Sequence, residues 1–264
     1  MRTANPALNA ESFAGAYGGA LAMTIEGTAL KTLVLLAILV ATGAFTWVQT
    51  VGGFDATTNV VREANRVHSI SGVPGYVWGY VLVGSLGGLI VALVTTFKKE
   101  WSPVTAPLYA GLEGVALGAY SAVFEYMYSG IVLQAVTLTV ATLAALLLAY
   151  SSGIVRATEN FKLGVVAATG AVAIVYVVDI CARAFFGVNV PFIHETGMVG
   201  IGVSGVIVVI AALNLVLDFD FIEKGAEQGA PKYMEWYGGF GLLVTLVWMY
   251  LEMLRLLAKI KSND

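Results

Sequence analysis

Long apolar stretches separated by short polar connections dominate the pattern of this sequence. A helix needs about 20 apolar residues to cross the hydrocarbon layer of a bilayer. Seven stretches meet that length, and they predict membrane-spanning helices at residues 32–52, 76–97, 104–128, 131–151, 163–187, 197–217 and 233–257. The chain is therefore expected to be an all-α, polytopic membrane bundle of about seven transmembrane helices.

The connections between these stretches divide the chain further. Only Tyr128, Ser129 and Gly130 join the third and fourth stretches, so these two helices are expected to form an antiparallel hairpin. The sequence indicates an N-terminal polar segment at residues 1–30, a transmembrane domain at 31–260 and a short tail at 261–264.

Glycines recur within the predicted helices at spacings that allow two backbones to approach closely. Small residues serve this purpose in membranes, where lipid supplies no hydrophobic drive between helices. We expect them to pack a monomeric bundle. The glycines concerned are Gly84 and Gly88, Gly114 and Gly118, and Gly197, Gly202 and Gly205.

Composition supports lipid rather than water as the surrounding solvent. The chain is 58% hydrophobic and 12% charged, whereas a soluble domain carries roughly 25% charged residues. A net charge of −3 gives no basic field for nucleic acid. The one cysteine, Cys181, excludes a disulfide framework and a cysteine metal cluster. Lys and Arg are more numerous on the N-terminal side of the spans, which predicts a cytoplasmic N-terminus.

Ionisable side chains inside the predicted spans are the candidates for function, because a charge at the bilayer centre costs at least about 2.5–3.5 kcal/mol. Glu113 lies a third of the way into the third helix, where it either lines an internal polar site or is structural. Glu125 lies near the end of that helix and is expected at the membrane interface. Asp179 and Arg183 are four residues apart, a spacing that predicts an ion pair on one helical face.

A second group of acids follows the predicted end of the sixth helix. Asp218 and Asp220 point about 200° apart on a helix, so at most one of them faces the bundle centre. The group consists of Asp218, Asp220, Glu223 and Lys224.

Glu252 is an acid in the last predicted helix, flanked by Trp248 and Tyr250. If the sixth and seventh helices pack side by side, Asp220 and Glu252 can meet and share one proton near neutral pH. Unprotonated, the two carboxylates would be oxygen ligands suited to Ca²⁺. The alternative places Asp220 at a solvated helix end and pairs Glu252 with Arg255, three residues further on.

No signature of an enzyme or of a resident cofactor accompanies these acids. His68 and His194 do not have the spacing of zinc ligands. A retinal protein needs a lysine in the middle of its last helix, and Lys259 lies at the end of this one. We therefore expect a protein that is not an enzyme.

Several motifs together resemble those of one membrane protein family. They are Leu112-Glu113-Gly114 in the third helix, the block from Ala212 to Glu223, the block from Gly229 to Tyr237, and the block from Tyr250 to Leu257. The chain resembles the bacterial branch of the Bax-inhibitor (transmembrane Bax-inhibitor-motif) family, and the matches extend from end to end.

The resemblance implies a bundle of seven helices with the last one central, located in the bacterial inner membrane. Members are described as pH-sensitive Ca²⁺ leak channels in which aspartates on the sixth and seventh helices act as sensor and gate. Asp220 resembles the first aspartate, with Asp218 as a near competitor. Glu252 resembles the second, although a glutamate replaces the aspartate.

Further roles and partners follow from the same resemblance. A basic residue near the second helix latches the acid pair in some members, and Arg62 or Arg66 is the candidate here. Glu113 is expected to belong to the same polar interior. Some bacterial relatives are thought to restrain a membrane-bound ATP-dependent protease or a stress pathway. A membrane interaction protein is therefore the alternative to a channel.

Overall fold

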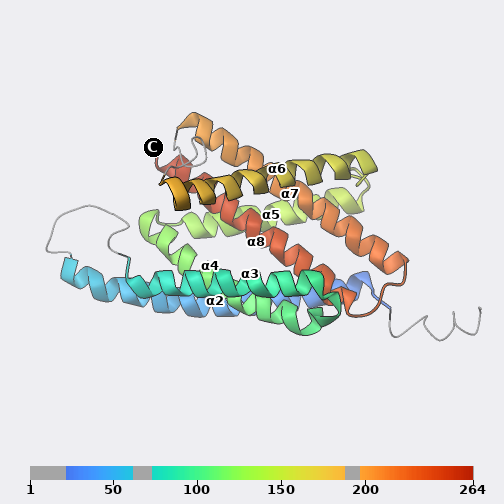
Figure 1. Cartoon of the computed structure of the whole chain (residues 1–264), viewed down its shortest axis with the longest axis horizontal. Coiled ribbons are helices and arrows are strands. Elements are labelled where there is room, and N and C mark those ends of the chain that lie inside the picture. The colour runs from blue at the N-terminus through green and yellow to red at the C-terminus, as the bar shows by residue number, and fades with distance from the viewer. Residues whose placement is uncertain (1–21, 62–72, 188–196, 264) are drawn as a thin grey trace, which may run out of the picture.

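The computed structural model describes residues 22–61, 73–187 and 197–263, and its named elements are all helices (Figure 1). The long helices are α2 (Ile25–Val61), α3 (Gly75–Phe97), α4 (Ser102–Met127), α5 (Ile131–Ser151), α6 (Glu159–Cys181), α7 (Met198–Glu227) and α8 (Met234–Lys261). A 3₁₀ turn, η3 (Lys99–Trp101), precedes α4, and a π-helical turn, η4 (Ala182–Phe186), extends α6. The predicted all-α bundle is confirmed.

Six of the described helices are long and apolar enough to cross a membrane, namely α2, α3, α5, α6 with η4, α7 and α8. Their outward faces carry large apolar side chains such as Phe45, Leu133 and Ile174, which are more than half exposed. Water does not tolerate an apolar surface of this extent, so lipid covers it. The seventh long helix, α4, is less apolar and packs between α2 and α3.

Helix α8 is the central element of the bundle. It packs against α2, α4, α5 and α7, and Figure 1 shows it running diagonally between the other helices. Half of its most apolar stretch is buried, a larger share than in any other candidate span. Other helices therefore cover α8 on most of its sides. The expectation that the last helix is central is thereby confirmed.

Glycines bring α2 and α3 close to α4. A Cβ added to Gly118 would lie 2.2 Å from the carbonyl oxygen of Gly43, and one added to Gly114 would lie 2.4 Å from that of Leu39. At the interface of α3 with α4, a Cβ on Gly84 would meet backbone of α4 at 2.7 Å. These positions therefore admit only glycine at the present helix spacing, as the sequence predicted.

The same prediction is wrong for the glycines at the start of α7. A Cβ added to Gly197, Gly202 or Gly205 would meet nothing within 4 Å. Neighbouring Val206 and Val209 are more than half exposed, so this part of α7 turns a small-residue face outward rather than against another helix.

The short turn between α4 and α5 forms as predicted, and Gly130 occupies it with a φ of 78°. Glu125 accepts hydrogen bonds from the backbone nitrogens of Gly130 at 2.5 Å and Val132 at 3.2 Å. Its carboxylate thus satisfies free amides at the start of α5. Beyond the turn the two helices diverge, because α5 packs mainly on α7 and α8.

Helix α7 extends ten residues beyond its predicted end at residue 217 and finishes at Glu227. The acidic group therefore lies within the helix rather than in the connection that follows it. In the sequence this run of charged residues is typical of a loop. In the structure its side chains have partners on α6 and α8, described below.

Residues that precede α2 are attached to the turn between α7 and α8. The backbone nitrogen of Met23 donates to the carbonyl of Ala230 at 2.7 Å, and Ala22 forms an isolated antiparallel bridge with Pro231. The Met23 side chain is buried against Gly225 and Gly238. Because α2 begins at Ile25, the boundary predicted at residue 30 falls inside a helix of the bundle.

Candidate functional site

Asp220 lies on the side of α7 that faces α6. Its Oδ2 atom is 2.9 Å from the ammonium of Lys162 on α6 and 2.9 Å from that of Lys224, one turn along α7. The side chain is 15% exposed. Two lysines thus neutralise Asp220 near one end of the bundle, and the alternative of a freely solvated acid does not hold.

Asp218 points the other way, toward α8. The hydroxyl of Thr245 donates a hydrogen bond to its carboxylate, and a Cβ added to Gly241 of α8 would lie 3.9 Å from Oδ1. Its Oδ2 atom is buried and has no hydrogen-bond partner among the described residues. Of the two competing aspartates, the one facing the bundle centre is therefore Asp218.

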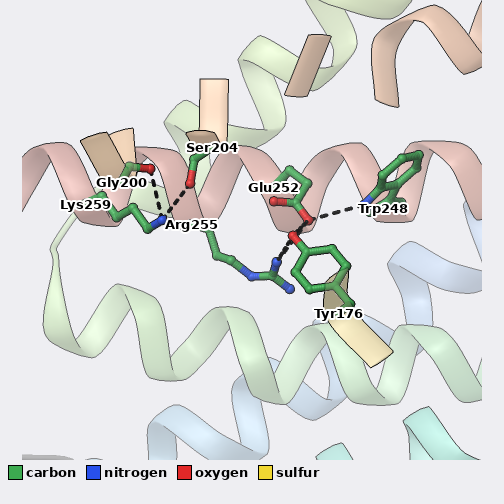
Figure 2. Close-up of polar contacts among 7 residues, drawn as sticks. All are labelled: Tyr176, Gly200, Ser204, Trp248, Glu252, Arg255 and Lys259. Atoms are coloured by element: carbon green, nitrogen blue, oxygen red, sulfur yellow. Dashed lines mark hydrogen bonds and ion pairs between the residues drawn. The ribbon is translucent and has the colours of Figure 1, made fainter. Parts of the chain in front are cut away.

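Glu252 is held by a network of side chains from α6 and α8 (Figure 2). Its Oε1 atom accepts hydrogen bonds from the Tyr176 hydroxyl at 2.7 Å, from Arg255 at 2.9 Å and from the Trp248 indole at 3.2 Å. Arg255 also donates to the Tyr176 hydroxyl at 2.6 Å. The Oε2 atom is buried and, within the described chain, has no partner.

A polar stripe continues along α8 beyond this network. Trp248, Glu252, Arg255 and Lys259 are spaced by four, three and four residues, so they share one helical face. The buried ammonium of Lys259 donates to the hydroxyl of Ser204 at 2.8 Å and to the carbonyl of Gly200 at 3.1 Å (Figure 2). This half of α8 therefore presents charged groups to α6 and α7 inside an apolar bundle.

The structure does not bring Asp220 and Glu252 together, which corrects the predicted acid pair. Helices α7 and α8 are antiparallel, and Gly241 and Thr245 of α8 lie beside Asp218. Glu252 follows Thr245 by seven residues, which is about 10 Å along a helix, and Asp220 lies beyond Asp218 on the side away from Glu252. The acids of α7 and α8 thus lie at different levels of the hairpin, and each has its own partners. They do not form a joint Ca²⁺ site in this state.

Glu113 lies near the middle of α4 and faces α3. A Cβ added to Gly88 of α3 would lie 2.7 Å from its Oε2 atom, so the glycine leaves room for the carboxylate. No hydrogen bond or ion pair joins Glu113 to any other residue that the structure describes. The half-buried carboxylate thus lies near the middle of α4, on the side toward α3 rather than with the acids of α7 and α8.

Glu235, at the start of α8, is a further buried acid that the sequence analysis did not single out. Its Oε1 atom accepts from the backbone nitrogen of Thr24 at 3.1 Å, from the Thr24 hydroxyl at 2.9 Å and from Lys232 at 2.7 Å. A Cβ on Gly27 would collide with this carboxylate. Glu235 therefore lies against the first turn of α2, where a negative charge is stabilising.

Comparison with known proteins gives one match. The chain matches the family described as Bax inhibitor 1 like over residues 5–262. It belongs to this family. Nothing among the curated proteins and nothing among the solved structures matches it.

The family match and the structure support part of what the resemblance implied about the helices and their acids. The Bax inhibitor 1-like chain has a central last helix and acids on its two inner helices, as expected. The candidate latch residues Arg62 and Arg66 lie outside the described residues. Within those residues, no group of three or more His, Cys, Asp or Glu side chains could hold a metal ion.

Two contacts of the candidate site in this Bax inhibitor 1-like protein were not predicted from the sequence. Tyr176 hydrogen-bonds to Glu252, and Lys259 hydrogen-bonds to Ser204 and Gly200 further along α8. The spacing of Glu252, Arg255 and Lys259 on one face was visible in the sequence and could have indicated a stripe. The position of Tyr176 on α6 could not, because it depends on how α6 lies against α8.

Proposed function

We propose that this protein is a pH-sensitive Ca²⁺ leak pathway in the bacterial inner membrane, with its N-terminus in the cytoplasm. One observation carries the proposal: Asp218, on an inner helix, buries a carboxylate oxygen that has no partner in the described chain. Its ionised form costs several kcal/mol in a low-dielectric interior, whereas Arg255 neutralises Glu252. Packing around Asp218 therefore depends on its protonation.

The separation of the two acids changes how such a pathway would work. Thr245, which hydrogen-bonds to Asp218, precedes Glu252 by about 10 Å along α8, so the two acids do not act as one shared pair. Protonation removes the charge of Asp218 and keeps α7 and α8 closely packed, while Glu252 stays paired with Arg255. Deprotonation calls for a cation or water between the helices, and Ca²⁺ is a cation that favours carboxylate oxygens. Flux is therefore expected to rise with pH.

Ca²⁺ flux into proteoliposomes over a series of pH values tests the proposal. Asp218→Asn preserves side-chain size but cannot ionise, so it should flatten the pH dependence. Glu26→Gln changes an exposed acid in the first turn of α2 and should leave the pH dependence intact. Flux whose pH dependence is unchanged in Asp218→Asn would refute the gate.

A membrane interaction protein is the second candidate, and the attachment of Ala22 and Met23 to the α7–α8 turn favours it. Because of this attachment, Ala22, where the described chain begins, lies at the turn that joins the two inner helices. A partner that binds residues 1–21 would act close to these helices. We propose a membrane-bound ATP-dependent protease as the partner.

Deletion of residues 2–21 tests this second candidate. In reconstituted membranes the deletion should change the rate at which such a protease degrades a membrane substrate, while Ca²⁺ flux stays the same. A protease rate that is the same with the full chain, with the deletion variant and without the protein excludes this role.

A further inference from the structure

An apolar groove opens on the side of the bundle that faces lipid. It has a volume of about 480 Å³, and α2 and α5 form its walls while α4 and α8 form its floor. Helix α2 packs on α4 and α8, whereas α5 diverges from α4 and packs on α7 and α8. The groove occupies the space that this divergence leaves.

The chemistry of the lining selects a ligand without charge. None of the lining residues is ionised, and the hydroxyl groups are already satisfied. Ser121 and Tyr250 hydrogen-bond to each other at 2.6 Å, and Thr139 donates to the carbonyl of Ala135 at 2.8 Å. Water in such a space would lack the two to four polar partners that it needs. The occupant must therefore be hydrocarbon.

The length of the groove matches one leaflet of the bilayer. On α2 the lining extends from Leu36 to Val48, which is about 18 Å along a helix, close to the roughly 15 Å of hydrocarbon in one leaflet. One acyl chain of a lipid in that leaflet is therefore long enough to lie along the groove.

The groove is continuous with the surface that already contacts lipid. The side chains along its rim, among them Val40, Val48 and Val140, are each more than half exposed. We propose that the groove binds one acyl chain of a bilayer phospholipid between α2 and α5, against α8. The free energy of binding comes from packing rather than from transfer of the acyl chain out of water, because an unfilled groove deprives the side chains that line it of dispersion contacts.

Photo-crosslinking tests this site in proteoliposomes. A phospholipid with a diazirine in its acyl chain is mixed into the bilayer, and labelled peptides are located by mass spectrometry. Val140→Trp places an indole at the rim of the groove. The matched control is Val166→Trp on α6, at a valine of nearly equal exposure, 59% against 57%. Val40→Trp on the opposite wall serves as a second filling variant, and thermal melting verifies that each variant folds.

The wild-type chain should be labelled more strongly on the groove segments of α2 and α5 than on the equally exposed face of α6. Each filling variant should reduce groove labelling about fivefold, the factor that corresponds to about 1 kcal/mol, and Val166→Trp should not. Labelling that follows exposure alone, or that Val140→Trp and Val40→Trp leave unchanged, overturns the proposal. Groove labelling that falls as the protein density in the bilayer rises would also overturn it, because it would show that a second copy fills the groove.

Discussion

Glu252 accepts all of its side-chain hydrogen bonds in the described chain through one carboxylate oxygen. Tyr176, Arg255 and Trp248 all donate to Oε1, whereas Oε2 is buried without a partner in the described chain. The side chain itself is 1% exposed. Removing a donor from such a site leaves a charge that neither water nor protein satisfies.

Arg255→Met should therefore destabilise the protein by about 1–3 kcal/mol. Adding Glu252→Gln to Arg255→Met removes the uncompensated charge, so the double variant should recover part of the loss. Thermal melting in detergent measures both. A double variant that is less stable than Arg255→Met alone would show that the carboxylate does not depend on the arginine.

Unlike Glu252, Asp220 has two cationic partners, because Lys162 and Lys224 both contact its Oδ2 atom. Lys162→Met or Lys224→Met alone should cost less than about 1 kcal/mol, the usual range for partly exposed ion pairs. The two changes together leave Asp220 unpaired and should cost more than the sum of the single losses. A double-mutant cycle measures this coupling. Strictly additive losses would mean that the lysines do not substitute for each other.

At the scale of the helices, the crossing of α2 and α4 depends on the absence of side chains at two glycines of α4. Gly118→Ala should destabilise the protein by about 1–3 kcal/mol, because the new Cβ meets the backbone of Gly43, which cannot move without shifting α2. Gly202→Ala on α7 is the control, since nothing lies within 4 Å of its Cβ. That variant should be neutral or up to about 1 kcal/mol more stable. Equal melting temperatures for the two variants would contradict the close crossing.

The helices show which parts of the structure the sequence could predict. Helix α5 has the predicted bounds, because a continuous apolar stretch lies between a glycine turn and a polar connection. Gly114 and Gly118 were recognised as contact positions, but their partner helix was not, since spacing carries no information about the neighbour. The end of α7 was predicted too early, because a run of charged residues is typical of a loop. The sequence does not show that Lys162, on another helix, neutralises Asp220 and so allows this charged stretch to remain helical.

The candidate site was predictable in composition but not in arrangement. Sequence motifs identified Asp218, Asp220 and Glu252 as the acids of the inner helices. Whether two of them meet depends on the register between α7 and α8, and a shift of a few turns separates them. Glu235 escaped attention because its partner, Thr24, lies 211 residues away in the chain.

At the scale of the whole molecule, α8 connects elements from both ends of the chain. Its first turn holds the start of α2 through Glu235, and its later turns contact α5 and α7. Glu235→Ala should therefore cost about 1–3 kcal/mol and should speed amide hydrogen exchange at residues 23–28. Glu26→Gln, at an exposed acid of the same turn, should change neither. Exchange that is as slow as in the wild type would show that Glu235 does not hold α2.

The hydrogen bond between Thr24 and Glu235 also determines when the molecule can be completed during synthesis. At roughly 5–20 residues per second, a ribosome makes Glu235 about 10–40 s after Thr24. Helix α2 must wait through that interval with its first turn open. A nascent chain that stalls before its last helix is made never closes that turn.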